Sequence, residues 1–425
     1  MKIYFSGIGG VGIGPLAQIA HYAGHEVTGS DRESSLLTEN LKKQGISFDI
    51  GSQNGTFLKR SNETKPIDWF VHTAALPQNH PEIVEARNLG LKTAKRDELL
   101  SKIISDKKLK LIAIAGTHGK TSTTALTTWI FKKLNIPISY SIGSTISFGD
   151  SGFYNKDSDF FVYECDEFDR NFLHFNPFLS VITSVDYDHP DTYPTKEDYA
   201  NAFKEFIEKS ENTVAWEDQM PSIYLGQRNV NLLQCESDIN PDITLPGEHN
   251  RKNATLVVAG LTDVGIIDKN NYANAISAVN SFPGADRRFE RLLPNLYTDY
   301  GHHPIEIKAT LEMAKEIAQK NNQDIVLVYQ PHQNIRQHNI KKDYSDQFLN
   351  ASKIYWLPTY LSREDPSLPI LTPNELTENI INKENIIFAE PNDELWVKLQ
   401  EDLNHGALVV GMGAGSIDKW MRQKS

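Results

Sequence analysis

The sequence is poor in cysteine, with Cys165 and Cys235 as the only two in 425 residues. Two cysteines this far apart make neither a disulfide framework nor a CxxC metal pair. The N-terminal segment MKIYFSGIGG enters a strand and a glycine turn at once. It lacks the apolar core and the small-residue cleavage site of a signal peptide. We therefore expect a cytoplasmic protein.

The sequence also lacks an excess of positive charge and any long apolar run. Lysine and arginine number 43 against 55 acidic residues, which gives a net charge of −12. This balance argues against binding to nucleic acids or anionic membranes, because both gain affinity from clustered positive charge. No apolar run approaches the roughly 20 residues that span a bilayer. With 39% hydrophobic residues, the chain can form packed cores, so we expect a folded, multidomain enzyme. We expect a monomer or a homodimer.

Short β-rich runs alternate with amphipathic stretches from end to end. This alternation predicts an α/β fold with parallel sheets covered by helices. At roughly 150 residues per domain, the length suggests about three domains. A lysine-rich segment at 101–110 and the Pro283–Gly284 break mark the predicted boundaries. The predicted domains are a Rossmann-like domain over 1–106, a central sheet of the P-loop type over 107–283 and a second Rossmann-like domain over 284–425.

The first motif is a glycine-rich turn directly after the strand at residues 2–5. Gly9, Gly10 and Gly12 let the backbone turn tightly and approach a diphosphate at a helix N-terminus. Asp31 ends the second strand, about where a ribose hydroxyl would sit. The motif predicts a nucleotide diphosphate ligand, and both NAD and a UDP-sugar fit it.

The second motif lies between the strand LKLIAIA and a helix, and it predicts a loop that cradles phosphates. Lys120 supplies a positive charge for the β- and γ-phosphates of ATP, and Thr121 supplies a hydroxyl for Mg²⁺. Ile114 stands where the strict pattern has glycine, but the strand–loop–helix context favours an ATP loop. The predicted ATP-binding residues are Gly116, Thr117, His118, Gly119, Lys120, Thr121 and Ser122.

Acidic clusters follow two further strands of the central region. YECDEFD follows the strand FFVYE, and DYDHPD follows LSVITSV. Because parallel sheets place ligands at the carboxyl ends of their strands, these clusters predict a Mg²⁺ site beside the ATP phosphates. Glu164 and His189 are the favoured ligands together with Thr121, and the remaining acids are weaker candidates.

Polar motifs also follow strands of the C-terminal region, and each is weak alone. They are GEHNRKNA, which opens a helix, DYGHHP, QPHQNIR and GMGAGS. Their recurrence at strand ends predicts a binding edge on the third domain as well.

Together, GIGGVG, GTHGKT, YECDEFD, DYDHPDTY, GEHNRKNA, DYGHHP, QPH and GMGAGS resemble, in their order, the Mur ligase family. These are ATP-dependent, amide-forming enzymes of peptidoglycan precursor synthesis. The resemblance covers nearly the whole chain, and the pairing of GTHGKT with DYGHHP is typical of the L-alanine-adding branch. It implies that UDP-N-acetylmuramate and L-alanine are joined through an acyl phosphate, with ATP and Mg²⁺ required.

The resemblance also implies roles for single residues. Lys120, Glu164, His189 and Arg336 would be catalytic, with Arg336 pairing with the alanine carboxylate. Thr121 and Glu164 would lie at magnesium, and His189 would hold a second magnesium. Asn250 would reach the adenine of ATP. The remaining expected contacts with nucleotide or substrate are Asp299, Tyr300, His302 and His332.

Three features distinguish this chain within the family pattern. Phe203 stands where other branches carry a carbamylated lysine, as expected for the L-alanine-adding branch. Gln333 replaces an arginine, and the segment between His189 and Asn250 is short. Two alternatives remain at this stage: a ligase that reattaches a recycled tripeptide to UDP-N-acetylmuramate, and an NAD-dependent oxidoreductase suggested by the glycine turn.

Overall fold

The computed structural model describes residues 1–425 except 11, 74–75, 190–191, 221–229, 235–236 and 363. It divides into two compact units. The first unit contains residues 1–243 and 253–282, and the second contains residues 244–252 and 283–425. No helix among the described residues is long and apolar enough to cross a membrane. Cys165 is buried and free, whereas Cys235, Pro190 and Asp191 lie outside the described residues.

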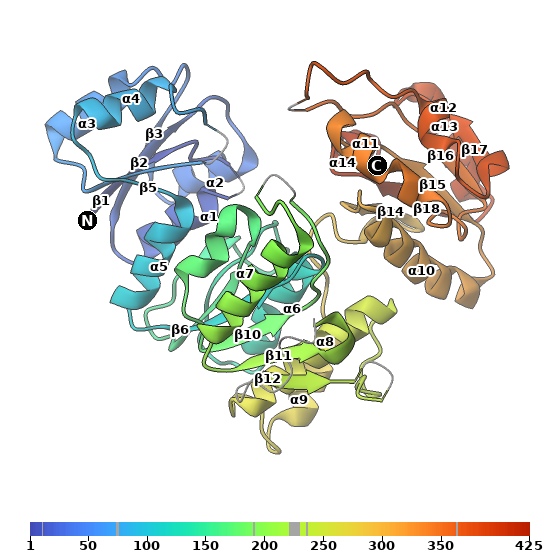
Figure 1. Cartoon of the computed structure of the whole chain (residues 1–425), viewed down its shortest axis with the longest axis horizontal. Helices are drawn as coiled ribbons and strands as arrows, with labels where there is room; N and C mark the ends of the chain where they lie inside the picture. The colour runs from blue at the N-terminus through green and yellow to red at the C-terminus, as the bar shows by residue number, and fades with distance from the viewer. Residues whose placement is uncertain (11, 74–75, 190–191, 221–229, 235–236, 363) are drawn as a thin grey trace. The chain divides into compact units, whose positions relative to one another are not determined.

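The first sheet of the first unit is entirely parallel (Figure 1). Its strands are β1 (Lys2–Ser6), β2 (Glu26–Asp31), β3 (Ser47–Ile50), β4 (Trp69–His72) and β5 (Thr93–Ala94). Its helices are α1 (Gly14–Tyr22), α2 (Leu36–Lys43), α3 (Thr56–Thr64), α4 (Pro81–Asn88) and α5 (Arg96–Asp106). The strand order β3-β2-β1-β4-β5 reverses direction at β1, and the glycine turn follows that strand. Doubly wound sheets bind ligands at such a point.

The second sheet has the order β12-β11-β10-β6-β9-β7-β8 and is parallel except for the β7–β8 pair. Its strands are β6 (Lys110–Ala115), β7 (Ser139–Ser141), β8 (Gly152–Phe153), β9 (Phe160–Glu164), β10 (Leu179–Ile182), β11 (Thr213–Trp216) and β12 (Val230–Leu233). The associated helices are α6 (Lys120–Lys133), α7 (Lys196–Glu208), α8 (Glu248–Asp263) and α9 (Tyr272–Asn280), with the short 3-10 helices η1 (Phe168–His174) and η2 (Glu217–Gln219). Residues 111–115 of β6 are all buried, which explains the unbroken apolar run in the sequence.

One hydrophobic core joins the two sheets of the first unit. Leu100 and Ile103 of α5 belong to the same buried cluster as Phe5 of β1 and Phe161 of β9. The helix α1 packs against β8 as well, since a Cβ on Gly152 would lie 2.1 Å from the carbonyl oxygen of Pro15. The core therefore holds the glycine turn and the carboxyl end of β9 in a fixed relation.

The sheet of the second unit has the order β13-β14-β18-β15-β16-β17, and only β13 and β14 pair antiparallel. Its strands are β13 (Glu290–Leu293), β14 (Leu296–Asp299), β15 (Ile325–Tyr329), β16 (Lys353–Trp356), β17 (Ile386–Phe388) and β18 (Leu408–Met412). Its helices are α10 (Pro304–Asn321), α11 (Asn334–Ile340), α12 (Pro373–Thr377), α13 (Asp393–Asn404) and α14 (Ile417–Lys424), with the 3-10 helices η4 (Lys341–Tyr344) and η5 (Lys383–Asn385). The predicted α/β class, with three largely parallel sheets, is confirmed. The predicted domain boundaries stay predictions.

Candidate active site

The phosphate loop connects β6 to α6 and lies against the segment that follows β10. Gly116 has φ +136°, and a Cβ there would lie 2.2 Å from the Thr183 hydroxyl oxygen and 2.8 Å from the Ser184 nitrogen. The backbone N–H of Thr117 donates to the Ser184 carbonyl at 3.1 Å, and that of His118 donates to the Ser184 hydroxyl at 3.0 Å. These contacts fix the loop. The first N–H groups of α6, which have no acceptors within the helix, then form its anion-binding end.

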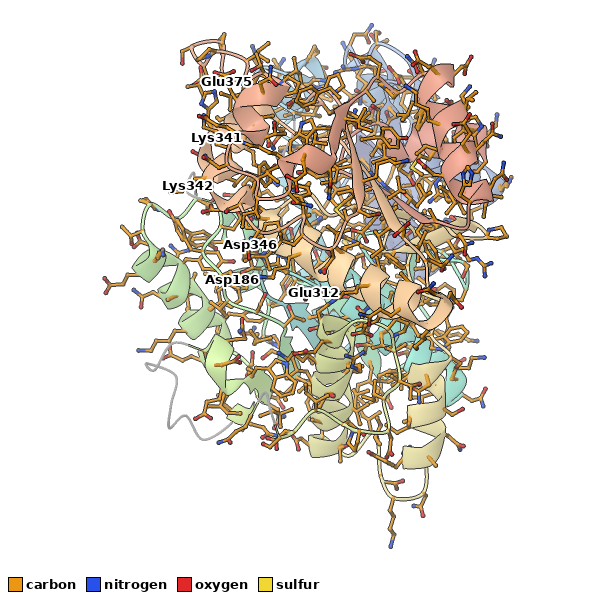
Figure 2. The ribbon with its side chains drawn as sticks, turned by 90° about the vertical axis from the view of Figure 1, so that its right-hand side faces the viewer. Asp186, Glu312, Lys341, Lys342, Asp346 and Glu375 are labelled. Atoms are coloured by element: carbon orange, nitrogen blue, oxygen red, sulfur yellow. The ribbon has the colours of Figure 1, made fainter. Side chains whose placement is uncertain are left out.

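The side chain of Thr117 ties the loop to two other elements. Its hydroxyl donates to the carbonyl of Asp186 at 2.7 Å and accepts from the backbone N–H of Asp186 at 2.8 Å. Asp186 follows β10 and is labelled in Figure 2. The Tyr199 hydroxyl of α7 lies 2.8 Å from the same oxygen. The Thr117 side chain therefore holds the loop against the segment that follows β10 and against α7, in addition to its predicted place in the ATP site.

Lys120 forms an ion pair with Glu167. In the sequence, Glu167 is only one of the weaker candidates for the Mg²⁺ site. The ammonium donates to the two carboxylate oxygens at 2.8 and 3.1 Å and to the Gly116 carbonyl at 2.5 Å. The Glu167 side chain is 1% exposed and that of Lys120 is 13% exposed. Burial acts to lower the pKa of Lys120, but the carboxylates of Glu167 and Asp166 outweigh it and raise that pKa. Lys120 is therefore charged at neutral pH.

Asp166, Glu167 and His189 form a group that could hold a metal ion. One ligand atom from each lies within 4.8 Å of the others. The imidazole Nε2 of His189 is 3.8 Å from Glu167 and 3.7 Å from Asp188. His189 also has φ +56°, a conformation that non-glycine residues adopt rarely and that occurs often at functional sites. The carboxylate oxygens of this group fit the predicted Mg²⁺, whereas the imidazole is a ligand that transition metals prefer.

The other two predicted metal ligands lie together at the start of α6. The Thr121 hydroxyl donates to Glu164 at 2.9 Å, and the second oxygen of Glu164 accepts from the Gly143 N–H at 3.0 Å. This hydroxyl–carboxylate pair sits at the carboxyl end of β9, as the sequence predicts. The structure thus distributes the predicted ligands over two groups, with Thr121 and Glu164 in one and His189 in the other.

Asn253 lies against the phosphate loop, whereas the family resemblance implies that Asn250 reaches the adenine. A Cβ on Gly119 would lie 2.6 Å from the Asn253 amide nitrogen and would displace that side chain, and the φ of +83° at this position also favours glycine. Asn250 belongs to the second unit, where its amide donates to the Pro246 carbonyl at 2.9 Å. The helical spacing in GEHNRKNA places these two asparagines about one turn apart, and that spacing is the signal by which Asn253 could have been found.

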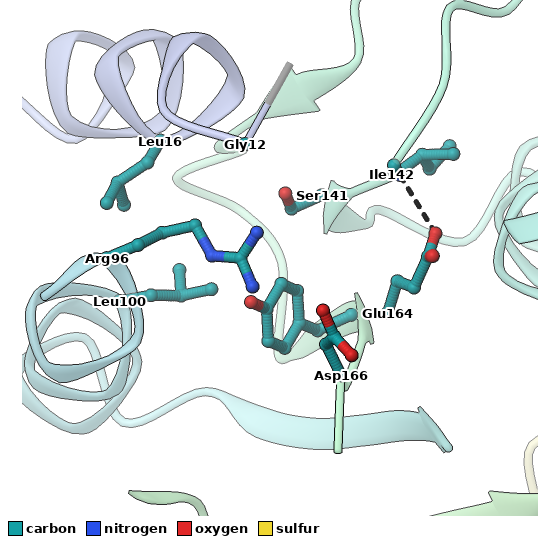
Figure 3. A pocket seen from close by; sticks show the side chains of 10 residues that line it. Gly12, Leu16, Arg96, Leu100, Ser141, Ile142, Glu164 and Asp166 are labelled. Atoms are coloured by element: carbon teal, nitrogen blue, oxygen red, sulfur yellow. Dashed lines mark hydrogen bonds between the residues drawn. The ribbon is translucent and has the colours of Figure 1, made fainter. Parts of the chain in front are cut away.

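The glycine turn of the first sheet is closed by Asp31. Its carboxylate accepts from the N–H of Gly9 at 2.7 Å and from the N–H of Arg32 at 2.7 Å. Gly10 donates to the Gly7 carbonyl at 3.0 Å, which completes the tight bend. Asp31 therefore shapes the turn itself. Gly12 faces a pocket that also contains Arg96 (Figure 3).

The second unit brings together four of the predicted substrate-binding residues. The guanidinium of Arg336 contacts the Nε2 atom of His302. The centroid of the His302 ring lies 5.4 Å from that of Tyr300 and 5.7 Å from that of His332. The ring of His332 in turn stacks on Tyr360. Tyr360 is a neighbour that the sequence motifs did not single out.

His302 is held in its neutral form. Burial lowers its pKa to about 4, against the opposing effect of Glu306. Its Nδ1 lies 3.2 Å from the Tyr300 carbonyl, to which it donates, so its Nε2 carries the lone pair that accepts from Arg336. This orientation of the imidazole fixes Arg336 beside the rings of Tyr300, His302 and His332.

Asp299 and Gln333 have structural partners in the second unit. Asp299 is buried and accepts from the N–H groups of Gly301 at 2.7 Å and Phe289 at 2.8 Å, and burial raises its pKa. The N–H of Gln333 donates to the Tyr360 carbonyl at 2.9 Å, and Gln333 precedes α11 with φ +60°. The predicted role of Asp299 in nucleotide binding stays a prediction.

Two family models match the chain. Residues 2–108 match the model described as Mur ligase family, catalytic domain, and residues 114–229 match the Mur ligase middle domain. The chain is 30% identical to the UDP-N-acetylmuramate–L-alanine ligase of Carboxydothermus hydrogenoformans, covering 99% of this chain and 95% of that protein. It is 31% identical to the enzyme of the same name from Clostridium botulinum strain Loch Maree, covering 98% and 96%.

Solved structures give the same picture. The UDP-N-acetylmuramate–alanine ligase MurC of Thermotoga maritima superposes with a TM-score of 0.77 at 25% identity, over 100% of this chain and 98% of that one. The murein peptide ligase of Psychrobacter arcticus has a TM-score of 0.64 at 19% identity, over 100% and 98%, and this similarity shows the fold alone.

Proposed function

The chain belongs to the Mur ligase family, and from this premise we propose that it joins the carboxylate of UDP-N-acetylmuramate to the amino group of L-alanine at the expense of ATP. The observation that carries the proposal is the full-length similarity to ligases of that name, at 30–31% identity. The charged Lys120 in its phosphate loop supports it, because a positive charge there serves phosphoryl transfer.

In the proposed reaction, a carboxylate oxygen of UDP-N-acetylmuramate attacks the γ-phosphorus of ATP, and the bond to ADP breaks. The amine of L-alanine, once deprotonated, attacks the resulting acyl phosphate. Phosphate then leaves and the amide forms. The loop and the first turn of α6 bind the phosphates, and Lys120 stabilises the charge on the transferred group. For this step Lys120 exchanges part of its contact with Glu167 for phosphate oxygens.

Two groups of side chains would hold Mg²⁺. These are the Thr121–Glu164 pair and the group of Asp166, Glu167 and His189. When bound, Mg²⁺ supplies positive charge that offsets the charge of the phosphate oxygens. In the second unit, Arg336 would bind the alanine carboxylate, because its planar guanidinium matches a carboxylate with two parallel hydrogen bonds. The contact with the Nε2 atom of His302 holds the guanidinium in place.

The experiment that tests this function is a substrate screen. Purified protein with ATP, Mg²⁺ and UDP-N-acetylmuramate is given single amino acids, the recycled tripeptide, or neither, and phosphate release is measured. We expect release that depends on both the muramyl nucleotide and L-alanine. Release with the tripeptide but not with L-alanine would assign the chain to peptide recycling. Tight NADH binding without nucleotide-sugar binding would revive the oxidoreductase alternative.

A variant of Lys120 tests the chemistry directly. Lys120→Ala is expected to lower kcat by at least about 100-fold, since it removes a preorganised charge from the transferred phosphoryl group. UDP-N-acetylmuramate binding, measured by calorimetry, serves as the control for folding. Near-normal product formation by this variant would remove Lys120 from the mechanism.

A further inference from the structure

A small pocket lies in the first unit between the glycine turn and the carboxyl end of β9. Its lining includes Gly12 of the glycine turn, Leu16 of α1 and Arg96 of α5. The opposite wall includes Ser141 of β7, Glu164 of β9 and Asp166, which follows β9 (Figure 3). Its two walls carry opposite charges. Arg96 lies on the side of the glycine turn, and the carboxylates of Glu164 and Asp166 lie on the other side.

Arg96 is oriented by a buried clamp. Its Nε donates to one oxygen of Asp97 at 3.2 Å, and the Tyr163 hydroxyl donates to the other oxygen. The side chain of Asp97 is 3% exposed and that of Arg96 is 28% exposed. One oxygen of Asp97 therefore holds Arg96 by its inner nitrogen, while Tyr163 holds the other oxygen and fixes the carboxylate. The two terminal nitrogens of Arg96 have no hydrogen-bond partner among the described residues and face the pocket.

Gly12 lies directly beside this terminal edge. A Cβ on Gly12 would be 2.9 Å from the Nη1 atom of Arg96, so a side chain at this position would displace the guanidinium. Gly12 precedes Gly14, the first residue of α1, and helix N-termini attract phosphates. The absence of a side chain at position 12 therefore leaves the guanidinium edge and the glycine turn open to the same ligand.

We propose that Arg96 binds the diphosphate of the UDP-sugar through its two terminal nitrogens, held in position by Asp97 and Tyr163. This inference rests on the proposed function, which supplies a nucleotide diphosphate as substrate. A guanidinium edge with parallel N–H donors matches phosphate oxygens. The carboxylates of Glu164 and Asp166 repel an anion, so the diphosphate belongs on the Arg96 side. The lactyl carboxylate is the other anion of the same substrate, but the proximity of Arg96 to Gly12 favours the diphosphate.

Calorimetric titration with three nucleotides tests the assignment. UDP carries uridine and the diphosphate, UDP-N-acetylglucosamine adds a sugar, and UDP-N-acetylmuramate adds the lactyl carboxylate. Arg96→Gln is expected to weaken binding of all three by about 10- to 100-fold, the range for losing charge-assisted hydrogen bonds. The matched control is Arg60→Gln, the same change at an exposed position of α3, which should leave all three affinities unchanged.

Two outcomes would overturn the proposal. Unchanged affinity for UDP would remove Arg96 from diphosphate binding, and a loss confined to UDP-N-acetylmuramate would assign Arg96 to the carboxylate. Binding of ATP reports folding of the same unit and should stay normal. If Arg96→Gln fails to fold, Arg96→Lys is tested in its place. Lysine keeps the positive charge beside Asp97 but lacks the paired N–H donors of the guanidinium. UDP binding equal to that of the unaltered protein would then contradict the proposal. Failure of the proposed function is seen separately, as absent binding of UDP-N-acetylmuramate to the unaltered protein.

Discussion

Replacing Glu167 by glutamine tests whether the buried carboxylate holds Lys120. The substitution keeps the shape and one acceptor oxygen but removes the charge that lies 2.8 Å from the Lys120 ammonium. Breaking a buried ion pair by removing one partner costs about 3–5 kcal/mol. Because Lys120 also donates to the carbonyls of Gly116 and Thr117, we expect a value near the lower end, about 3 kcal/mol.

The assay is urea unfolding of the unaltered protein, Glu167→Gln, Lys120→Met and the double variant. Hydrogen exchange of the α6 amides measures the stability of the first unit separately from that of the second. We expect the double variant to be more stable than Glu167→Gln alone, since it leaves no unpaired buried charge. The expected coupling energy is about 2 kcal/mol. Additive effects of the two single substitutions would refute the view that Glu167 holds Lys120.

Three further predictions concern the loop and the second unit. Gly116→Ala should weaken ATP binding at least about 10-fold by calorimetry, because its Cβ would lie 2.2 Å from the Thr183 hydroxyl oxygen; unchanged affinity would contradict the loop geometry. His302 has a pKa lowered to about 4, so its contribution to stability is present above pH 6.5 and is lost, by about 3 kcal/mol in total, as the pH falls through 4. His302→Asn should therefore flatten the pH dependence of unfolding between pH 6.5 and 4, and an unchanged profile would count against a buried neutral imidazole. Arg336→Lys should raise KM for L-alanine about 10-fold or more while KM for ATP stays nearly constant, and equal changes in both would remove Arg336 from the amino-acid site.

Much of the fold was predictable because local rules agree with tertiary structure. The strand–loop–helix context of GTHGKT predicts a phosphate loop, and the structure places it between β6 and α6. Phe203, noted at the position of a lysine in other branches, is buried in α7 with its ring 5.1 Å from Phe172. At this position, the residue type itself indicates a core environment.

The details of the site depend on contacts between segments that are distant in sequence, and these were not predictable. Glu167 differs from its acidic neighbours only because the fold places it, buried, against a lysine 47 positions away. Arg96 carries no motif of its own and gains its orientation from Asp97 and Tyr163. Asn253 stands in the motif GEHNRKNA, but its place beside the phosphate loop depends on the close approach of α8 to Gly119.

In the proposed reaction, the terminal phosphoryl group of ATP passes to the carboxylate of UDP-N-acetylmuramate. Oxygen-isotope transfer can follow this step. UDP-N-acetylmuramate labelled with ¹⁸O in both carboxylate oxygens is converted with ATP and L-alanine, and the released phosphate is examined by mass spectrometry. We expect one ¹⁸O atom in each phosphate and one in the new amide. Unlabelled phosphate formed together with amide product would contradict it.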